Sequence, residues 1–172
     1  GFKSKKEWKK GMKIDFIDAK RAYFHAGARR DVYIELPLGD EMEGYCGKLN
    51  KSMYGTRDAA QNWELAYTEF LVEEGFTQGT CSPCMLYHRS KNIRVVVHGD
   101  DFTVLAYVNQ LDWFREAIKK RFEVKLRGRL GPDDGDDKSI RILNRILTWT
   151  DKGIIYEADQ RHAEIICKSM GY

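Results

Sequence analysis

Two adjacent aspartates, Asp100 and Asp101, are the residues of this chain best suited to chemistry. They follow Gly99 and lie between two apolar, β-branched runs, residues 93–97 and 102–106. This pattern predicts a β-hairpin that carries both acids at its turn. Two neighbouring carboxylates repel each other, so a bound cation is the natural reason to keep them together. Aspartates at a hairpin tip are also common turn formers, which is the competing structural interpretation.

A third carboxylate would complete a site for divalent metal ions and phosphoryl transfer. We expect it to be Asp18, at the end of a strand in which apolar and polar residues alternate from residue 12 onward. The alternation predicts that this strand is half-buried. Asp15 competes for the role, but an alternating strand places it on the opposite face. Tyr23 follows five residues after Asp18, where its ring could lie beside a nucleotide sugar.

Hydrophobic periodicity and turn residues predict the elements that position these acids. Further strands are expected at residues 32–36, 84–87, 140–148 and 154–156, helices at 59–74, 111–122 and 159–170, and loops at 39–47 and 128–138. Strands and helices are interspersed, without a regular βαβ repeat or a glycine-rich phosphate loop. The order favours a single α+β domain with a mainly antiparallel sheet packed on helices.

Composition and charge narrow the class of protein. The chain has 172 residues, is 42% hydrophobic and can form a core. No apolar run approaches the ~20 residues of a membrane span, and no signal-peptide pattern appears, so we expect an intracellular protein that is not secreted. The net charge is only +3, but basic residues cluster at 3–13, 29–30 and 119–129 and acids at 133–137. These basic clusters suit a phosphate-rich partner, with a solvated surface as the alternative; we expect the acidic cluster to be a solvated loop.

The cysteines give a weaker signal. Cys81 and Cys84 have the spacing of half a zinc site or of a redox pair. No second pair with matching spacing exists, Cys46 is isolated, and His88 is the nearest imidazole. We therefore expect reduced, partly buried thiols instead of a zinc site.

Several motifs in order resemble the reverse transcriptases of copia-type LTR retrotransposons. The first catalytic motif of that family is similar to DAKRAYF at residues 18–24, and its following strand to VYIELP at residues 32–37. The most recognisable stretch of the family is similar to KLNKSMYGTRDAAQNW at residues 48–63. Residues 81–87, the Gly-Asp-Asp at 99–101 and the strand and helix at 154–170 also match in order. The resemblance covers almost the whole chain from about residue 10, and the order and spacing of the motifs make it specific.

The resemblance implies a fold and a set of site residues. The chain would form the palm of a polymerase over about residues 10–126, with parts of the fingers, and a connection or thumb-like part over about 127–172, in one domain spanning 1–172. Three aspartates would be catalytic and hold two Mg²⁺ ions, with Mn²⁺ as a substitute, and four residues would bind the nucleotide. The metal ligands would be Asp18, Asp100 and Asp101, and the nucleotide-binding residues Tyr23, Tyr54, Gly55 and Arg57. Trp63 is expected to be a core residue.

The resemblance also implies a reaction. The expected function is RNA-directed DNA synthesis as part of a retrotransposon polyprotein, with an RNA template, a DNA primer and dNTPs as partners. By similarity, the Tyr23 ring would exclude a ribose 2′-hydroxyl. A catalytically inactive remnant that binds nucleic acid is the alternative function, and a non-binding structural relic is a further one. An RNA-templated RNA polymerase is a further possibility, because Gly-Asp-Asp is common there, but Tyr23 argues against it. The oligomeric state is left open.

Overall fold

A six-stranded antiparallel sheet forms the centre of the fold. The structure is a computed structural model, and it describes residues 11–157 and 160–171. The strand order is β4-β5-β6-β7-β1-β8, so β1 lies between β7 and β8. The strands are β1 (Lys13–Ala19), β4 (Thr77–Gln78), β5 (Met85–His88), β6 (Ile93–His98), β7 (Asp101–Ala106) and β8 (Val124–Leu130). The expected α+β class with a mainly antiparallel sheet is confirmed.

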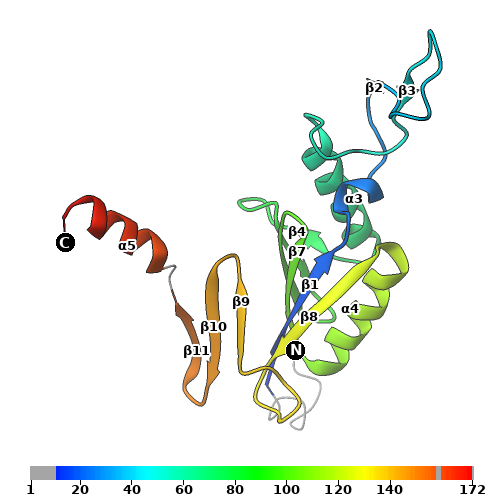
Figure 1. The fold of residues 1–172 in the computed structure, drawn as a ribbon. Helices are drawn as coiled ribbons and strands as arrows, with labels where there is room; N and C mark the ends of the chain where they lie inside the picture. The colour runs from blue at the N-terminus through cyan, green and yellow to red at the C-terminus, as the bar shows by residue number, and fades with distance from the viewer. Residues whose placement is uncertain (1–10, 158–159, 172) are drawn as a thin grey trace.

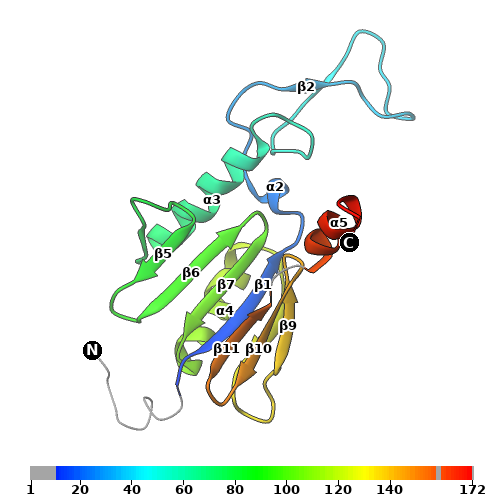
Figure 2. The same cartoon turned by 90° about the vertical axis from the view of Figure 1, so that its left-hand side faces the viewer.

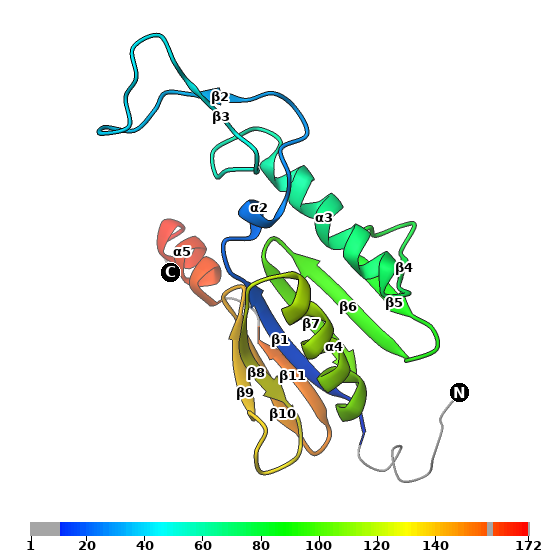
Figure 3. The same ribbon diagram turned by 90° about the vertical axis from the view of Figure 1, so that its right-hand side faces the viewer.

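Two long helices cover one face of this sheet. They are α3 (Ala59–Glu73) and α4 (Val108–Arg121), and both lie on the same side in Figure 3. Their apolar stripes form one core with the inward side chains of the strands, including Trp63, Phe102 and Phe114. Phe102 and Phe114 are at most 1% exposed. Burying side chains of this size stabilises the fold by about 1.5–3 kcal/mol each, so this face is the main core.

A second, three-stranded sheet covers the other face near β1. Its strands are β9 (Ser139–Ile142), β10 (Arg145–Thr150) and β11 (Gly153–Glu157), in the order β11-β10-β9 (Figure 2). Apolar residues of this sheet pack on Ile14, Phe16 and Leu130. The expectation of a half-buried β1 is therefore wrong: Lys13 to Ile17 are all buried, because helices cover one face and the small sheet covers the other.

The remaining elements project from the two sheets. The short helix α2 (Ala22–His25) follows β1, and α5 (Gln160–Ser169) follows the small sheet. The strands β2 (Tyr33–Ile34) and β3 (Gly47–Lys48) pair within an extended arm that leaves the main sheet (Figure 1). The strand expected over 32–36 is thus only two residues long. Among the described residues, no helix has the length and apolar character needed to cross a membrane.

Two further segments differ from the sequence expectation. The loop expected over 128–138 begins only after Leu130, because β8 continues along β1. The single strand expected over 140–148 is two strands, β9 and β10, joined at Leu143 and Asn144. Both turn residues have positive φ (47° and 60°), as a type I′ hairpin requires. Leucine rarely adopts that conformation, so no turn signal marked it.

Some residues of the basic and acidic clusters form ion pairs with each other within the fold. Lys13 is 3% exposed, and its Nζ lies 2.7 Å from Asp133 Oδ2 and 2.5 Å from Asp136 Oδ2. The Asp136 side chain is only 7% exposed, so the acidic cluster is not a fully solvated loop. A buried ammonium needs a counter-ion, which is why these acids fold back onto β1. The basic residues at positions 3–10 lie outside the described residues.

The four cysteines differ in their burial. All four are free; Cys46, Cys81 and Cys167 are exposed and Cys84 is half-buried, so the expected partial burial holds only for Cys84. In the part of the chain that the structure describes, no third His, Cys, Asp or Glu ligand joins Cys81 and Cys84.

The burial of His88 predicts that the stability of the fold depends on pH. His88 is 7% exposed, and its ring packs edge-on against Phe76 (5.0 Å between centroids) and Trp113 (5.8 Å). Burial lowers the pKa of His88 below the ordinary value of 6.5, and the nearby Lys91 ammonium lowers it further. The stabilising contribution of neutral His88 is therefore complete above the unfolded-state pKa of 6.5 and is lost as pH falls through the lower folded-state pKa.

We expect the free energy of unfolding to fall as pH decreases from about 7 to about 5. His88→Gln should flatten this slope because it removes the titrating group. Urea unfolding at several pH values measures it, and His98→Gln, at an exposed position on β6, is the matched control. An unchanged slope in His88→Gln would contradict the assignment.

Candidate metal centre

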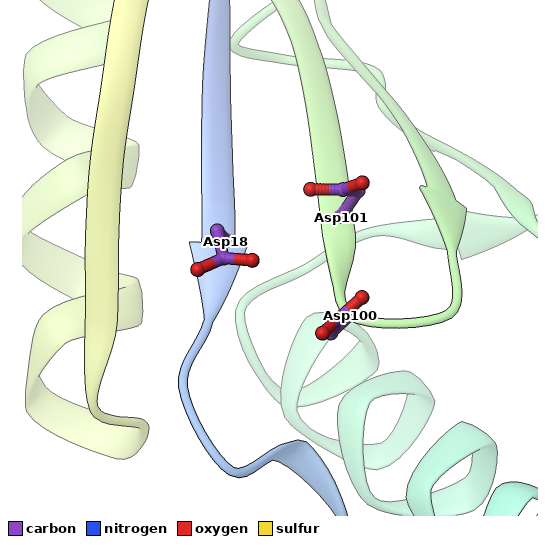
Figure 4. A group of neighbouring side chains, drawn as sticks. All are labelled: Asp18, Asp100 and Asp101. Atoms are coloured by element: carbon purple, nitrogen blue, oxygen red, sulfur yellow. The ribbon is translucent and has the colours of Figure 1, made fainter. Parts of the chain in front are cut away.

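Three carboxylates meet where β1 ends and β7 begins. Asp18 lies on β1 and pairs in register with Asp101 on β7, and Asp100 occupies the turn before it (Figure 4). One oxygen from each carboxylate lies within 4.8 Å of the others. Asp100 is exposed, Asp18 is half-buried and Asp101 is 8% exposed. The structure thus brings together the three acids that the sequence pointed to, and the antiparallel register is what aligns them.

The turn that carries Asp100 is held from two sides. His98 pairs with Asp101, which leaves Gly99 and Asp100 as the two turn residues. Gly99 has a φ of 61°, and Asp100 has no positive φ, the pattern of a type II′ turn that favours glycine first. Trp63 Nε1 donates a hydrogen bond to the Gly99 carbonyl at 2.7 Å, and the Ala19 amide donates to the Asp100 carbonyl at 2.8 Å. Trp63 is therefore a core residue that also positions the turn.

The electrostatics of the cluster favour a bound cation. Burial raises the pKa of Asp101 above the ordinary value of 3.8, and the charges of Asp100 and Asp18 raise it further. The Arg127 guanidinium opposes this effect and lowers the pKa of Asp101. Like charges at this separation destabilise the ionised state unless a cation offsets them. Carboxylate oxygens are the ligands that Mg²⁺ and Mn²⁺ prefer, so the donor set fits these ions.

Arg127 is a site residue that the sequence analysis missed. Its Nη2 donates to Asp18 Oδ1 at 3.1 Å, and its Nη1 lies 3.6 Å from Asp101 Oδ1. It was missed because β8 was not predicted: the segment was assigned to a basic cluster. The alternation of Val124 and Leu126 with basic residues was the available signal for a strand.

Asp15, the competing acid, has a different role. It is 0% exposed and lies on the helix-covered face of the sheet. Arg115 Nε donates to its Oδ2 at 2.5 Å, and Arg129 Nε donates to its Oδ1 at 2.6 Å. These guanidinium groups satisfy both carboxylate oxygens, so Asp15 is a structural anion and is not available to a metal ion.

The residues expected to bind a nucleotide lie partly together. The rings of Tyr23 and Tyr54 have centroids 4.4 Å apart and are tilted by 40°, and Tyr54 also meets Phe24 edge-on at 5.7 Å. Gly55 follows with a φ of 88°, a conformation that favours glycine. Arg57 is exposed and forms no salt bridge with any residue that the structure describes. The structure therefore brings Tyr23 and Tyr54 together directly, and Gly55 adjoins them in sequence.

Comparison with known proteins gives the family. Residues 5–132 match the family described as "Reverse transcriptase (RNA-dependent DNA polymerase)", a range that includes all three aspartates. The chain belongs to this reverse transcriptase family. The resemblance to copia-type retrotransposon reverse transcriptases, drawn from the motifs, is thereby confirmed.

One curated relative places the domain in a larger context. The chain is 29% identical over 129 residues to the "Retrovirus-related Pol polyprotein from transposon TNT 1-94" of Nicotiana tabacum. The match covers 70% of this chain and 9% of that polyprotein. This reverse transcriptase domain is thus similar to a small part of a retrotransposon polyprotein.

Proposed function

We propose that this domain catalyses RNA-directed DNA synthesis by two-metal nucleotidyl transfer onto a primer 3′-hydroxyl. The observation that carries the proposal is the convergence of Asp18, Asp100 and Asp101 within 4.8 Å. Two-metal sites hold their ions about 3.5–4 Å apart, which three carboxylates at this spacing can span. In this proposal the six-stranded sheet and helices α3 and α4 are the palm, with the β2–β3 arm in the fingers and residues after β8 leading toward the thumb.

The protein residues would bind and orient the reactants. Asp18 and Asp101, in register on neighbouring strands, would hold the ions together with Asp100 at the turn. Bound Mg²⁺ would activate the primer hydroxyl and stabilise the departing pyrophosphate. Phosphoryl transfer requires little covalent chemistry from the protein, so the positions and charges of these acids would account for much of the catalysis.

The aromatic pair would select the nucleotide. Tyr23, backed by Tyr54, would lie against the sugar of the incoming dNTP and exclude a 2′-hydroxyl. Gly55 would let the backbone approach the base pair closely, and Arg57 would contact phosphate groups of the template or the triphosphate. The proposed partners are an RNA template paired with a DNA primer, and dNTPs.

Primer extension tests this function. With poly(rA), oligo(dT) and Mg²⁺, we expect addition of dTTP, no addition without the metal, and little addition of UTP. Preference for UTP would favour an RNA polymerase instead. Salt-dependent binding of the hybrid without any addition would favour a nucleic-acid-binding remnant.

A further inference from the structure

Arg127 connects β8 to the carboxylate cluster from the side. Its guanidinium contacts Asp18 at 3.1 Å and Asp101 at 3.6 Å, so it bridges two of the three acids. Its side chain is 42% exposed, whereas that of Arg129, which binds Asp15, is 14% exposed. Arg127 can therefore leave its partners for solvent at little cost, and Arg129 cannot.

An irregularity in β8 places Arg127 and Arg129 on opposite faces of the sheet. Ile17 pairs with Leu126 and Phe16 with Gly128, so Arg127 is an extra residue in the β8 strand. Strict alternation would put Arg127 on the same face as Arg129, which binds Asp15 on the helix-covered face. Because of the extra residue, Arg127 shares the face of Lys125 and Asp18, whereas Arg129 turns to Asp15 on the other face. Bulges of this kind re-aim side chains next to functional sites.

We propose that Arg127 is a resident counter-ion of the carboxylate cluster, which offsets its charge when no divalent ion is bound and is displaced when one binds. The inference rests on the proposed metal function. The guanidinium and a divalent ion would compete for the oxygens of Asp18 and Asp101. A like charge beside a bound cation is also unfavourable. The protein would thus keep its acids aligned without metal, at the cost of weaker metal binding.

Titration with Mn²⁺ tests this competition in the whole chain, with calorimetry as the readout. We expect Arg127→Gln to tighten Mn²⁺ binding about fivefold, which corresponds to about 1 kcal/mol. Arg127→Lys should bind with intermediate affinity, because an ammonium keeps the charge but lacks the bridging fork. Lys125→Gln is the matched control: it removes the same charge from β8, opposite Asp18, at a side chain that forms no salt bridge with the described residues. Its effect should stay below about twofold.

Thermal unfolding adds a readout that a merely structural role would not give. Arg127→Gln should lower the melting temperature without metal, where the acids lose their counter-ion, and leave it unchanged with saturating Mn²⁺. An equal loss under both conditions, or Mn²⁺ affinity equal to that of the unmodified chain, would overturn the counter-ion role alone. Absence of Mn²⁺ binding in both proteins would overturn the proposed metal centre as well.

Discussion

Replacing Asp100 and Asp101 together with asparagine is expected to reduce Mg²⁺-dependent primer extension at least about 1,000-fold. Asparagine keeps the shape of each side chain but removes the negative charge that holds a divalent ion. The fold should survive, because burial raises the pKa of Asp101, which means that folding carries a cost for its negative charge. We therefore expect the metal-free melting temperature of the double variant to be equal to or above that of the unmodified chain.

A control variant shows whether the loss of extension depends on the position of the neutralised aspartates and not on the change in net charge alone. Asp151→Asn neutralises an exposed aspartate in the β10–β11 turn and should extend primers at the normal rate. Circular dichroism and melting curves establish that both variants are folded. Extension that persists in the double variant would show that these aspartates do not carry the reaction.

Asp15→Asn should have the largest effect on stability, a loss of about 3–5 kcal/mol in the free energy of unfolding. Asp15 is 0% exposed and accepts hydrogen bonds from Arg115 and Arg129. The amide would leave two guanidinium groups without their shared anion and would place N–H donors against them. The ion pairs of Asp15 also connect β1 to α4 and β8, so their loss weakens the contacts among three elements at once.

Urea unfolding measures this loss, and Asp112→Asn provides the comparison. Asp112 also binds Arg129, at 2.7 Å, but its side chain is 58% exposed. Solvent-exposed pairs contribute at most about 1 kcal/mol, so the control should be close to neutral. Equal, small losses in both variants would mean that the buried network does not stabilise the sheet.

Local patterns in the sequence predicted the centre of the site well. Alternation along β1 separated Asp18 from Asp15, and the two faces indeed hold different partners. The β-branched runs around Gly99 predicted the hairpin and its turn. These features depend on periodicity within a few residues, which is visible in the sequence itself.

Contacts between distant segments were not predictable in the same way. Arg127 reaches Asp18 across 109 positions, and the bulge in β8 is what places it and Arg129 on opposite faces of the sheet. Trp63 donates a hydrogen bond to the Gly99 carbonyl across 36 positions. The helical pattern around Trp63 predicted only that its side chain is buried in the core. The burial of β1 on both faces likewise depends on the three-stranded sheet, which folds back from residues 139–157. Such features arise from tertiary packing and bulge geometry, which single-sequence patterns do not encode.

Anomalous diffraction from crystals soaked with Mn²⁺ tests the central claim most directly, because it locates the ion without relying on activity. We predict a peak at coordination distance, about 2.0–2.3 Å, from oxygens of Asp18 and Asp101, with the Arg127 guanidinium moved away from both. A second peak should appear nearby when a dNTP is bound. The absence of a peak at the three aspartates in crystals that bind Mn²⁺ elsewhere, or in crystals that bind none, would contradict the account.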